Sequence, residues 1–334
     1  MKRREFIALI GSAAIMRSPG AGAVQAARVW RIGFLGSSPA ESLNERGEPG
    51  GSRFDALRAG MREHGHVEGK DFIIEWRVPE RAERCRELAA ELVRLKVDII
   101  IAVGWPAVEA AQAATSTIPI VIGYLSDPVA LGIVQGLARP AGNVTGLSSS
   151  MTDIIPKHLE LLMTAVPKLS RVAALLNPTN PTGPLLLRQL QASADMAGIT
   201  PVPMEARSAE EIIRGFTDMA RERIEAVIVM IDPVFTTQRH QIAELALKHS
   251  LPSIYGINEY AAAGGLMSYG DNLSVFYRRT AAYVDRIMKG AKPGDLPIEQ
   301  PTTAFNLVVN KKTANALRIK IPPELLVRAD EVIE

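Results

Sequence analysis

Short aliphatic runs alternate with longer stretches of helical period from residue 30 onward. In these stretches apolar residues recur every three or four positions, as Leu88, Leu92 and Leu95 do. Most of the aliphatic runs end in Gly, Asn or Asp. The runs are RIGFLG (31–36), FIIEW (72–76), VDIIIAVG (97–104), IPIVIGYL (118–125), VAALLN (172–177), ITPVPM (199–204), EAVIVMID (225–232), LPSIYG (251–256) and GLMSYG (265–270). This alternation predicts an α/β fold in which parallel sheets are covered by helices on both faces.

The two halves of the pattern resemble each other. VDIIIAVGWP, a helical stretch and IPIVIGY in the first half correspond to IEAVIVMIDP, a helical stretch and LPSIYG in the second. We therefore expect two similar doubly wound lobes joined by a hinge. Lobe one covers 28–148 and is completed by part of 273–334, and lobe two covers 149–272. The segment 291–310 is Pro-rich and not helical, which indicates a return crossing between the lobes.

Residues 1–26 have the pattern of an export signal. A positive start, MKRR, precedes an apolar run too short to span about 30 Å of hydrocarbon, and small residues follow. Arg3 and Arg4 stand before an aromatic and an aliphatic residue, as in twin-arginine signals; an ordinary secretory signal is the alternative. Cleavage after Ala23 or Ala26 would release a periplasmic protein, and no Cys stands there for lipid attachment.

Charge and cysteine content narrow the function classes. The chain has 38 Lys and Arg against 36 Asp and Glu, and the part beyond residue 26 has 34 against 35. A body so close to neutral, without a basic stripe, disfavours nucleic-acid binding. The single cysteine, Cys85, excludes an intramolecular disulfide. Because Leu88 and Leu92 share its helical face, we expect a buried core thiol.

Motifs for catalysis are missing from the sequence. No G-x-G-x-x-G follows a strand run, no G-x-S-x-G occurs, and GHVEGKD lacks the spacing of a phosphate-binding loop. His64 and His66 have no third ligand nearby in sequence, and His158, His240 and His249 lie in helical patterns whose histidines we expect at the surface. We therefore expect no catalytic residue, metal or cofactor, and a binding function.

Candidate binding residues follow from the strand runs, because the carboxyl ends of parallel strands line the crevice of such folds. This rule selects Ser37, Ser38, Trp105, Asp127, Asn177, Asn180, Asp232, Tyr255, Ser268 and Tyr269, and the last run leads to Asp271. Each has a structural alternative. The two aspartates before a Pro can be helix caps, the two asparagines can form turns, and the tyrosines can be core residues. Trp105, in a Gly-Trp-Pro turn, is expected to be an exposed stacking ring.

The chain resembles the substrate-binding proteins of ABC transporters, specifically the TrpX-like subfamily. The resemblance covers the whole chain and is carried by AGMREHGHVEGKD, ELVRLKVDIIIAVG, TIPIVIGYLSDPVALGIVQGLARPAGNVTGLS, VAALLNPTNP, LPSIYGINEYAAAGGLMSYGDN and KGAKPGDLPIEQPTTAFNLVVNKKTANALRI. It implies a monomeric two-lobed type I periplasmic-binding fold, a Venus flytrap that delivers a small ligand to an inner-membrane permease with its ATPase. The family pattern supports five cleft residues, namely Ser37, Asp127, Asn177, Asp232 and Tyr269. Trp105 departs from it, because that position usually carries a small or hydroxyl residue.

The function expected from this resemblance is capture of an amino-acid-like molecule or an aromatic or organic acid by hinge closure. Helix N-termini after Ser37 and Asn177 would hold a carboxylate, and Asp127 or Asp232 would hold an ammonium group. An aromatic ring would cover the rest of the ligand, supplied by Trp105, Tyr255 or Tyr269. The alternative is a periplasmic ligand-sensing module or an enzyme on the same scaffold.

Overall fold

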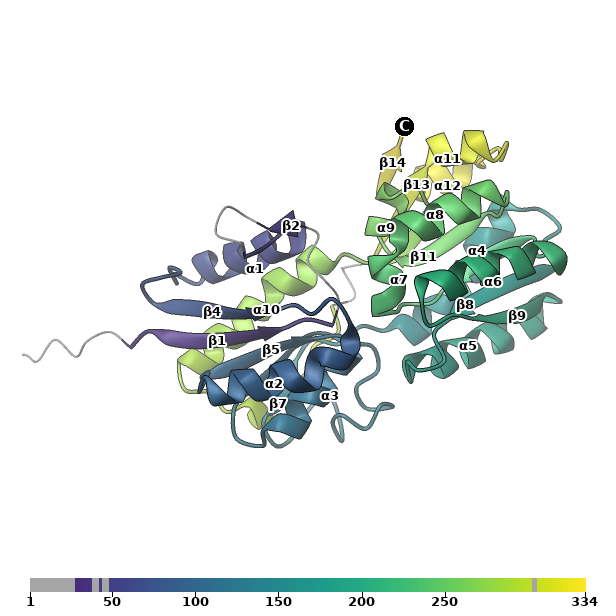
Figure 1. Ribbon diagram of the computed structural model, residues 1–334. Helices are drawn as coiled ribbons and strands as arrows, with labels where there is room; N and C mark the ends of the chain where they lie inside the picture. Colours follow the sequence, from purple (N-terminus) through teal and green to yellow (C-terminus); the bar gives the residue numbers. More distant parts are fainter. Residues whose placement is uncertain (1–27, 38–41, 44–47, 302–304) are drawn as a thin grey trace, which may run out of the picture.

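The protein has two α/β lobes that lie next to each other (Figure 1). The computed structural model describes residues 28–37, 42–43, 48–301 and 305–334. The predicted export signal and the site candidate Ser38 lie outside the described residues. Within the described residues, no helix is long and apolar enough to cross a membrane.

The sheet of lobe one has five parallel strands in the order β4-β1-β5-β6-β7. They are β1 (Trp30–Leu35), β4 (Phe72–Arg77), β5 (Ile99–Val103), β6 (Ile120–Tyr124) and β7 (Val144–Gly146). One face is covered by α1 (Ser52–Glu63) and α10 (Leu273–Met288), and the other by α2 (Cys85–Arg94) and α3 (Trp105–Ala114). A two-residue hairpin pairs β2 (Ser42–Leu43) with β3 (Pro49–Gly50), and η1 (Ala82–Arg84) precedes α2.

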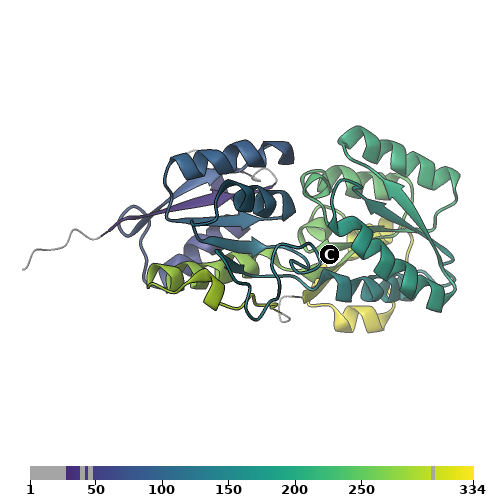
Figure 2. The same cartoon turned by 90° about the horizontal axis from the view of Figure 1, so that it is seen from below.

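Helices α1 and α10 come from distant parts of the chain and pack closely against each other. Gly60 makes this approach possible, because a Cβ there would lie 2.4 Å from the carbonyl oxygen of Arg278. Seen from below, α10 lies on lobe one, whereas the C-terminal segment drawn in yellow lies on lobe two (Figure 2). The pairing of α1 with α10 brings side chains of both helices to the same cavity.

The sheet of lobe two has seven strands in the order β14-β13-β12-β11-β10-β8-β9. They are β8 (Arg171–Leu176), β9 (Thr200–Glu205), β10 (Ala226–Val229), β11 (Ser253–Ile257), β12 (Met267–Asp271), β13 (Phe305–Asn310) and β14 (Glu331–Ile333). One face is covered by α4 (Met151–Ala165), α5 (Thr182–Ala197), α11 (Lys311–Ala316) and α12 (Pro323–Arg328). The other carries α6 (Ala209–Arg221), α7 (Pro233–Thr237), α8 (Arg239–Lys248) and α9 (Glu259–Ala262).

The predicted α/β fold of two parallel-sheet lobes is confirmed, except that the last two strands of lobe two run against the others, because β14 is parallel to β13. Strand β13 runs antiparallel to β12. The physical reason lies in the path of the chain: β12 ends at the hinge, and the chain returns from α10 and η2 (Pro293–Asp295) to enter the sheet from the hinge side. A strand that starts at the hinge must run opposite to one that ends there.

In the described part of the chain, three segments pass between the lobes. The first follows β7, the second is Asn272 between β12 and α10, and the third leads from η2 to β13. The first and third crossing segments run side by side. The Ser148 amide donates to the Glu299 carbonyl oxygen at 2.9 Å, and Leu147 and Glu299 form a parallel β-bridge. This arrangement forms a hinge of several adjacent strands.

Candidate functional site

A cavity lies between the lobes at the carboxyl ends of the strands, and we name it the inner chamber. Together with the solvent at its mouth it measures about 710 Å³. Lobe one supplies Ser37, Arg53, Phe54, Trp105 and Ser126 among others, and lobe two supplies Asn180, Thr182, Asp232, Pro233 and Thr236. The wall therefore needs both lobes.

Aromatic rings form one end of the inner chamber. Phe34, Phe54 and Tyr277 pack against one another with ring centroids 5.6 to 5.8 Å apart. Phe34 lies in β1, one residue before its end, whereas Phe54 and Tyr277 come from α1 and α10. All three line the chamber, as does Tyr124 at the end of β6. This end of the chamber is suited to a flat apolar or aromatic group.

Arg53 is a cation in the wall of the inner chamber that the sequence analysis missed. It is 5% exposed, lies in the first turn of α1 and places its guanidinium 5.1 Å from the centre of the Phe54 ring. It does not follow a strand, so the strand-end rule does not select it. The available signal was a basic residue at a helix N-terminus, where the helix dipole disfavours a cation.

Asp232 is the anion of the inner chamber and is 2% exposed. Its Oδ2 accepts hydrogen bonds from Asn180 Nδ2 at 3.0 Å and from Asn177 Nδ2 at 3.2 Å. Its Oδ1 accepts from the Val234 amide at 2.8 Å, which caps α7. Burial raises the pKa of Asp232 above its ordinary value, and the bonds from the two asparagines oppose this rise. Asp232 is thus a helix cap that also faces the chamber.

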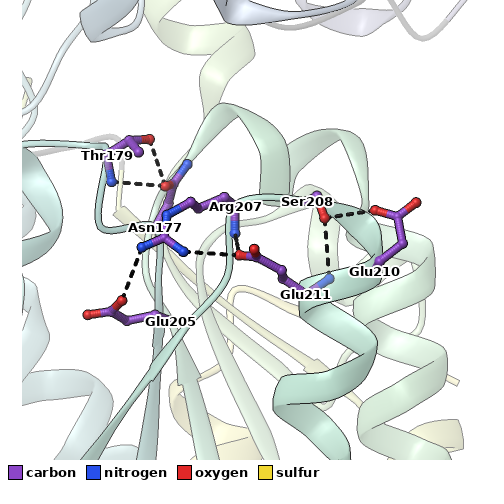
Figure 3. A network of polar contacts seen from close by, with 7 residues as sticks. All are labelled: Asn177, Thr179, Glu205, Arg207, Ser208, Glu210 and Glu211. Atoms are coloured by element: carbon purple, nitrogen blue, oxygen red, sulfur yellow. Dashed lines mark hydrogen bonds and ion pairs between the residues drawn. The ribbon is translucent and has the colours of Figure 1, made fainter.

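The two asparagines combine turn formation with support of Asp232. Asn177 Oδ1 accepts from the Thr179 amide at 3.1 Å and from its hydroxyl at 2.8 Å (Figure 3). Asn180 Oδ1 accepts in the same way from the Thr182 amide at 3.0 Å. The Asx turns fix both side chains, so their amide groups point at Asp232.

Arg207 lies at the rim of lobe two, where β9 leads into α6. It forms ion pairs with Glu205 at 3.4 Å and Glu211 at 3.5 Å (Figure 3), and its side chain is 52% exposed. The Ser208 hydroxyl caps α6 by accepting from the Glu211 amide. This network holds a charged group beside the opening of the cleft.

Ser37 and Trp105 are positioned by Gly104 between them. Gly104 has φ of +84° and precedes α3, and a Cβ at this position would lie 2.2 Å from Ser37 Oγ. Trp105 and Pro106 then form the first turn of α3. Only glycine meets both demands, the left-handed backbone and the close approach of Ser37.

A second cavity, which we name the outer chamber, lies on the other side of Trp105. With its surrounding solvent it measures about 1,090 Å³. Its wall carries several charged side chains and comes from η1, α2 and α3 of lobe one and from the segments that follow β8, β9 and β10 of lobe two. Asn177 lines only this chamber of the two, whereas Trp105, Asn180, Asp232 and Pro233 line both.

Four predicted site residues lie outside both chambers. Asp127, with φ of +45°, begins a turn next to the chamber residue Ser126. The other three belong to the core of lobe two, which corrects their expected place in the cleft: Tyr255, Ser268 and Tyr269. The reason is strand length. Strands β11 and β12 continue to Ile257 and Asp271, so these residues lie inside the strands and not at their ends.

Tyr255 is fully buried and stacks on Tyr260 with ring centroids 4.6 Å apart. Burial raises the pKa of the Tyr255 hydroxyl above its ordinary range. Tyr269 packs beside Phe305 and His158. These contacts give both rings a structural role.

His158 corrects the expectation that it is a surface residue. It is fully buried in α4, its Nε2 is hydrogen-bonded to the Tyr269 carbonyl oxygen, and burial lowers its pKa to about 4. His66 Nε2 lies 2.8 Å from Asp285 Oδ1, and His64 Nδ1 lies 3.8 Å from Asp285 Oδ2. In the described ranges, no three His, Cys, Asp or Glu side chains are placed to hold a metal ion.

Cys85 is buried, as predicted from its helical face. Burial raises the pKa of its thiol to about 12, so the nucleophilic thiolate form is suppressed. Its Sγ lies 3.5 Å from the Gly36 carbonyl oxygen. The side chain fills the core between α2 and β1.

Two α/β lobes, three crossings and a cavity walled by both lobes define a binding protein of the type I periplasmic-binding fold. Residues 52–333 match the family described as ABC transporter substrate binding protein. The chain belongs to this family, as its sequence resemblance predicted.

Three relatives illustrate this membership. A tyrosine-binding protein of Clostridioides difficile (strain R20291) is 23% identical over 258 residues, which cover 77% of this chain and 74% of that protein. The ABC domain from Streptococcus pneumonia in complex with L-Trp superposes with a TM-score of 0.83 at 24% identity, covering 92% of this chain and 100% of that one. A ligand-free, open substrate-binding protein with adhesive properties from Clostridium difficile gives 0.64 at 24% identity, covering 91% and 99%.

Proposed function

We propose that this protein is the periplasmic receptor of an ABC importer and that it captures an amino acid with an aromatic side chain. The observation that carries the proposal is a buried cation and a buried anion, Arg53 and Asp232, in the wall of one aromatic-lined cavity between the lobes. The family supports a transport function, and the tyrosine-binding relative and the L-Trp complex support the class of ligand.

The two charges match a zwitterion. A carboxylate is complementary to a buried guanidinium and an ammonium group to a buried carboxylate, so a ligand that brings both signs is complementary to both residues. The guanidinium of Arg53 binds the carboxylate with paired N–H donors, and Asp232 accepts from the ammonium group. The carboxylate was expected at the helix N-termini that follow Ser37 and Asn177, and the proposal places it instead at the side chain of Arg53. The helix that follows Ser37 is α1, which begins at Ser52 and carries Arg53 in its first turn. The helix that follows Asn177 begins at Thr182.

The ligand side chain occupies the aromatic end of the inner chamber. Phe34, Phe54 and Tyr277 offer ring edges and faces there, and aromatic pairs contribute about 0.5–1.5 kcal/mol each beyond area burial. Asn180, Thr182 and Thr236 supply hydrogen-bonding groups on the facing wall. A fully apolar molecule offers no hydrogen-bonding group to these side chains and no charge to Arg53 or Asp232.

Capture proceeds by closure of the lobes around the hinge. Because both lobes wall the inner chamber, the complete set of contacts exists only when the lobes are together. The higher TM-score with the L-Trp complex than with the open, ligand-free relative supports a closed arrangement here. Ligand binding then stabilises the closed state by its difference in affinity. The export-signal pattern of residues 1–26 supports a periplasmic location and delivery to an inner-membrane permease.

A binding screen of the ligand-stripped protein, beginning at residue 28, tests the function. L-tyrosine, L-tryptophan and L-phenylalanine at about 1,000 times the dissociation constant should stabilise the fold by about 4 kcal/mol, seen as a rise in Tm. Aliphatic amino acids and sugars should leave Tm unchanged. Mass spectrometry of the bound compound after overnight incubation should recover it unaltered. Absence of a Tm rise with every aromatic amino acid contradicts the proposed ligand class, and chemical conversion contradicts a receptor.

A further inference from the structure

We infer that Trp105 is the gate between the two chambers and that it limits the ligand to a single amino acid, an inference that rests on the proposed function. Without this ring, the same site would accept a dipeptide whose C-terminal residue is aromatic. The argument starts from the residues that the two chambers share.

Four residues line both chambers: Trp105, Asn180, Asp232 and Pro233. Three of them come from the β8 and β10 ends of lobe two, and Trp105 alone comes from lobe one. The boundary is therefore made by the indole ring facing the opposite lobe. Closure of the lobes brings the ring to this boundary, so the gate shuts in the same movement that encloses the ligand.

The ring is held on a fixed backbone. The Gly104 amide donates to the Tyr124 carbonyl oxygen at 2.8 Å, and the Val108 amide donates to the Gly104 carbonyl oxygen at 3.1 Å. Pro106 restricts the first turn of α3, and Trp105 packs against the core of lobe one. Opening the gate within the closed form requires rotation of the side chain, because the backbone cannot move without breaking these bonds.

The two chambers differ in chemistry. The inner chamber has the aromatic end and the charges of Arg53 and Asp232. The outer chamber has charged side chains on both lobes, namely Glu83, Arg86, Glu109 and Arg207, with Arg86 and Glu109 paired at 2.8 Å. A ligand part that reaches the outer chamber therefore meets charged side chains of both signs.

Asp232 lies at the boundary between the two chambers and therefore determines which atom of the ligand faces the outer chamber. In the proposed pose the ligand's amino nitrogen lies at Asp232, with the carboxylate at Arg53. A substituent on this nitrogen points past Trp105 toward the outer chamber. A second residue attached there is the N-terminal residue of a dipeptide. The linking nitrogen is then a neutral amide whose N–H can still donate to Asp232, and the dipeptide's ammonium group would meet the carboxylates of Glu83 and Glu109.

The test compares L-tyrosine with glycyl-L-tyrosine on four proteins: wild type, Trp105→Ala, Trp105→Phe and Val78→Ala. Val78 lines the inner chamber and not the outer one, so its truncation enlarges the site without opening the gate. Calorimetry gives both Kd values, and stopped-flow mixing gives the dissociation rate of L-tyrosine. Trp105→Val serves as a second variant if Trp105→Ala does not fold.

Wild type and Trp105→Phe should bind L-tyrosine at least 100-fold more tightly than the dipeptide. Trp105→Ala should release L-tyrosine at least tenfold faster and reduce the preference to tenfold or less, whereas Val78→Ala should keep the preference. If Trp105→Ala keeps the wild-type release rate and preference, the gate is refuted while the proposed function stands. If wild type binds no aromatic amino acid, the proposed function itself fails.

Discussion

The hydroxyl of Tyr124, at the end of β6 in lobe one, donates a hydrogen bond to Asp271 Oδ2, at the end of β12 in lobe two, across 2.9 Å. The Ser149 hydroxyl, in the first crossing segment, donates to the same carboxylate oxygen. Asp271 is fully buried, and it directly precedes the second crossing. One carboxyl group thus joins both lobes and two hinge segments, and its protonation affects the hinge.

The Asp271→Asn variant should change how stability depends on pH. Burial raises the pKa of Asp271 to about 6 from a model-compound value of 3.8. Because the folded-state pKa is the higher one, the stabilisation is complete below about pH 4 and is lost as pH rises through 6. The loss amounts to about 3 kcal/mol at most. Denaturant unfolding of both proteins from pH 4 to pH 7 should show Asp271→Asn gaining stability relative to wild type; a constant difference would contradict this.

The His158→Gln variant should show the opposite pH dependence. Burial lowers the pKa of His158 to about 4 from 6.5. A lowered folded-state pKa gives stability that is complete above pH 6.5 and is lost as pH falls through 4, on the order of 3 kcal/mol. The difference between wild type and His158→Gln should therefore shrink on acidification. In wild type the contributions of Asp271 and His158 to stability change in opposite directions over the same pH range. A stability that depends on pH more steeply in each single variant than in wild type therefore supports both pKa shifts.

Gly104→Ala should damage the site more than the same change at a matched glycine. Gly104 and Gly65 have nearly equal φ angles, +84° and +85°, but only at Gly104 does a new Cβ meet a neighbour, Ser37 Oγ at 2.2 Å. A residue other than glycine at such a positive φ costs about 1–3 kcal/mol, and both variants carry a cost of this kind. Gly104→Ala should lose more stability than Gly65→Ala and should weaken ligand binding, whereas Gly65→Ala should bind normally. Equal effects in calorimetry would contradict the positioning role of Gly104.

The strands show how far the sequence determines the fold. Every aliphatic run in the sequence overlaps a strand. The central strands are recognisable because runs buried on both faces have no polar alternation. Three strands of the two large sheets were not predicted. Strand β7 is three residues long, β13 follows a Pro-rich segment, and β14 is a short edge strand. Their formation depends on where the chain crosses the hinge, which local patterns do not record.

The site was partly predictable, because some of its residues lie at the ends of predicted strands. The strand-end rule found Ser37, Trp105 and Asp232, which line the inner chamber, because each lies within a few residues of the end of a strand. It misplaced Tyr255 by two residues of strand length. It also missed Arg53, because the residues of α1 and α10 reach the chamber only through the packing of two helices far apart in the chain. Such contacts are tertiary and leave no local pattern.

The central claim is that Arg53 binds the carboxylate of the amino acid and Asp232 its ammonium group. The most direct test measures the affinity for ligands that lack one of these two groups. Calorimetry should compare L-tyrosine, tyramine and 3-(4-hydroxyphenyl)propionate on wild type, Arg53→Gln and Asp232→Asn. Wild type should prefer L-tyrosine over either analogue at least tenfold, about 1.4 kcal/mol. Arg53→Gln should lose the preference over tyramine, which lacks the carboxylate, and Asp232→Asn the preference over the propionate, which lacks the ammonium group. If both preferences survive both substitutions, Arg53 and Asp232 do not bind the ends of the ligand.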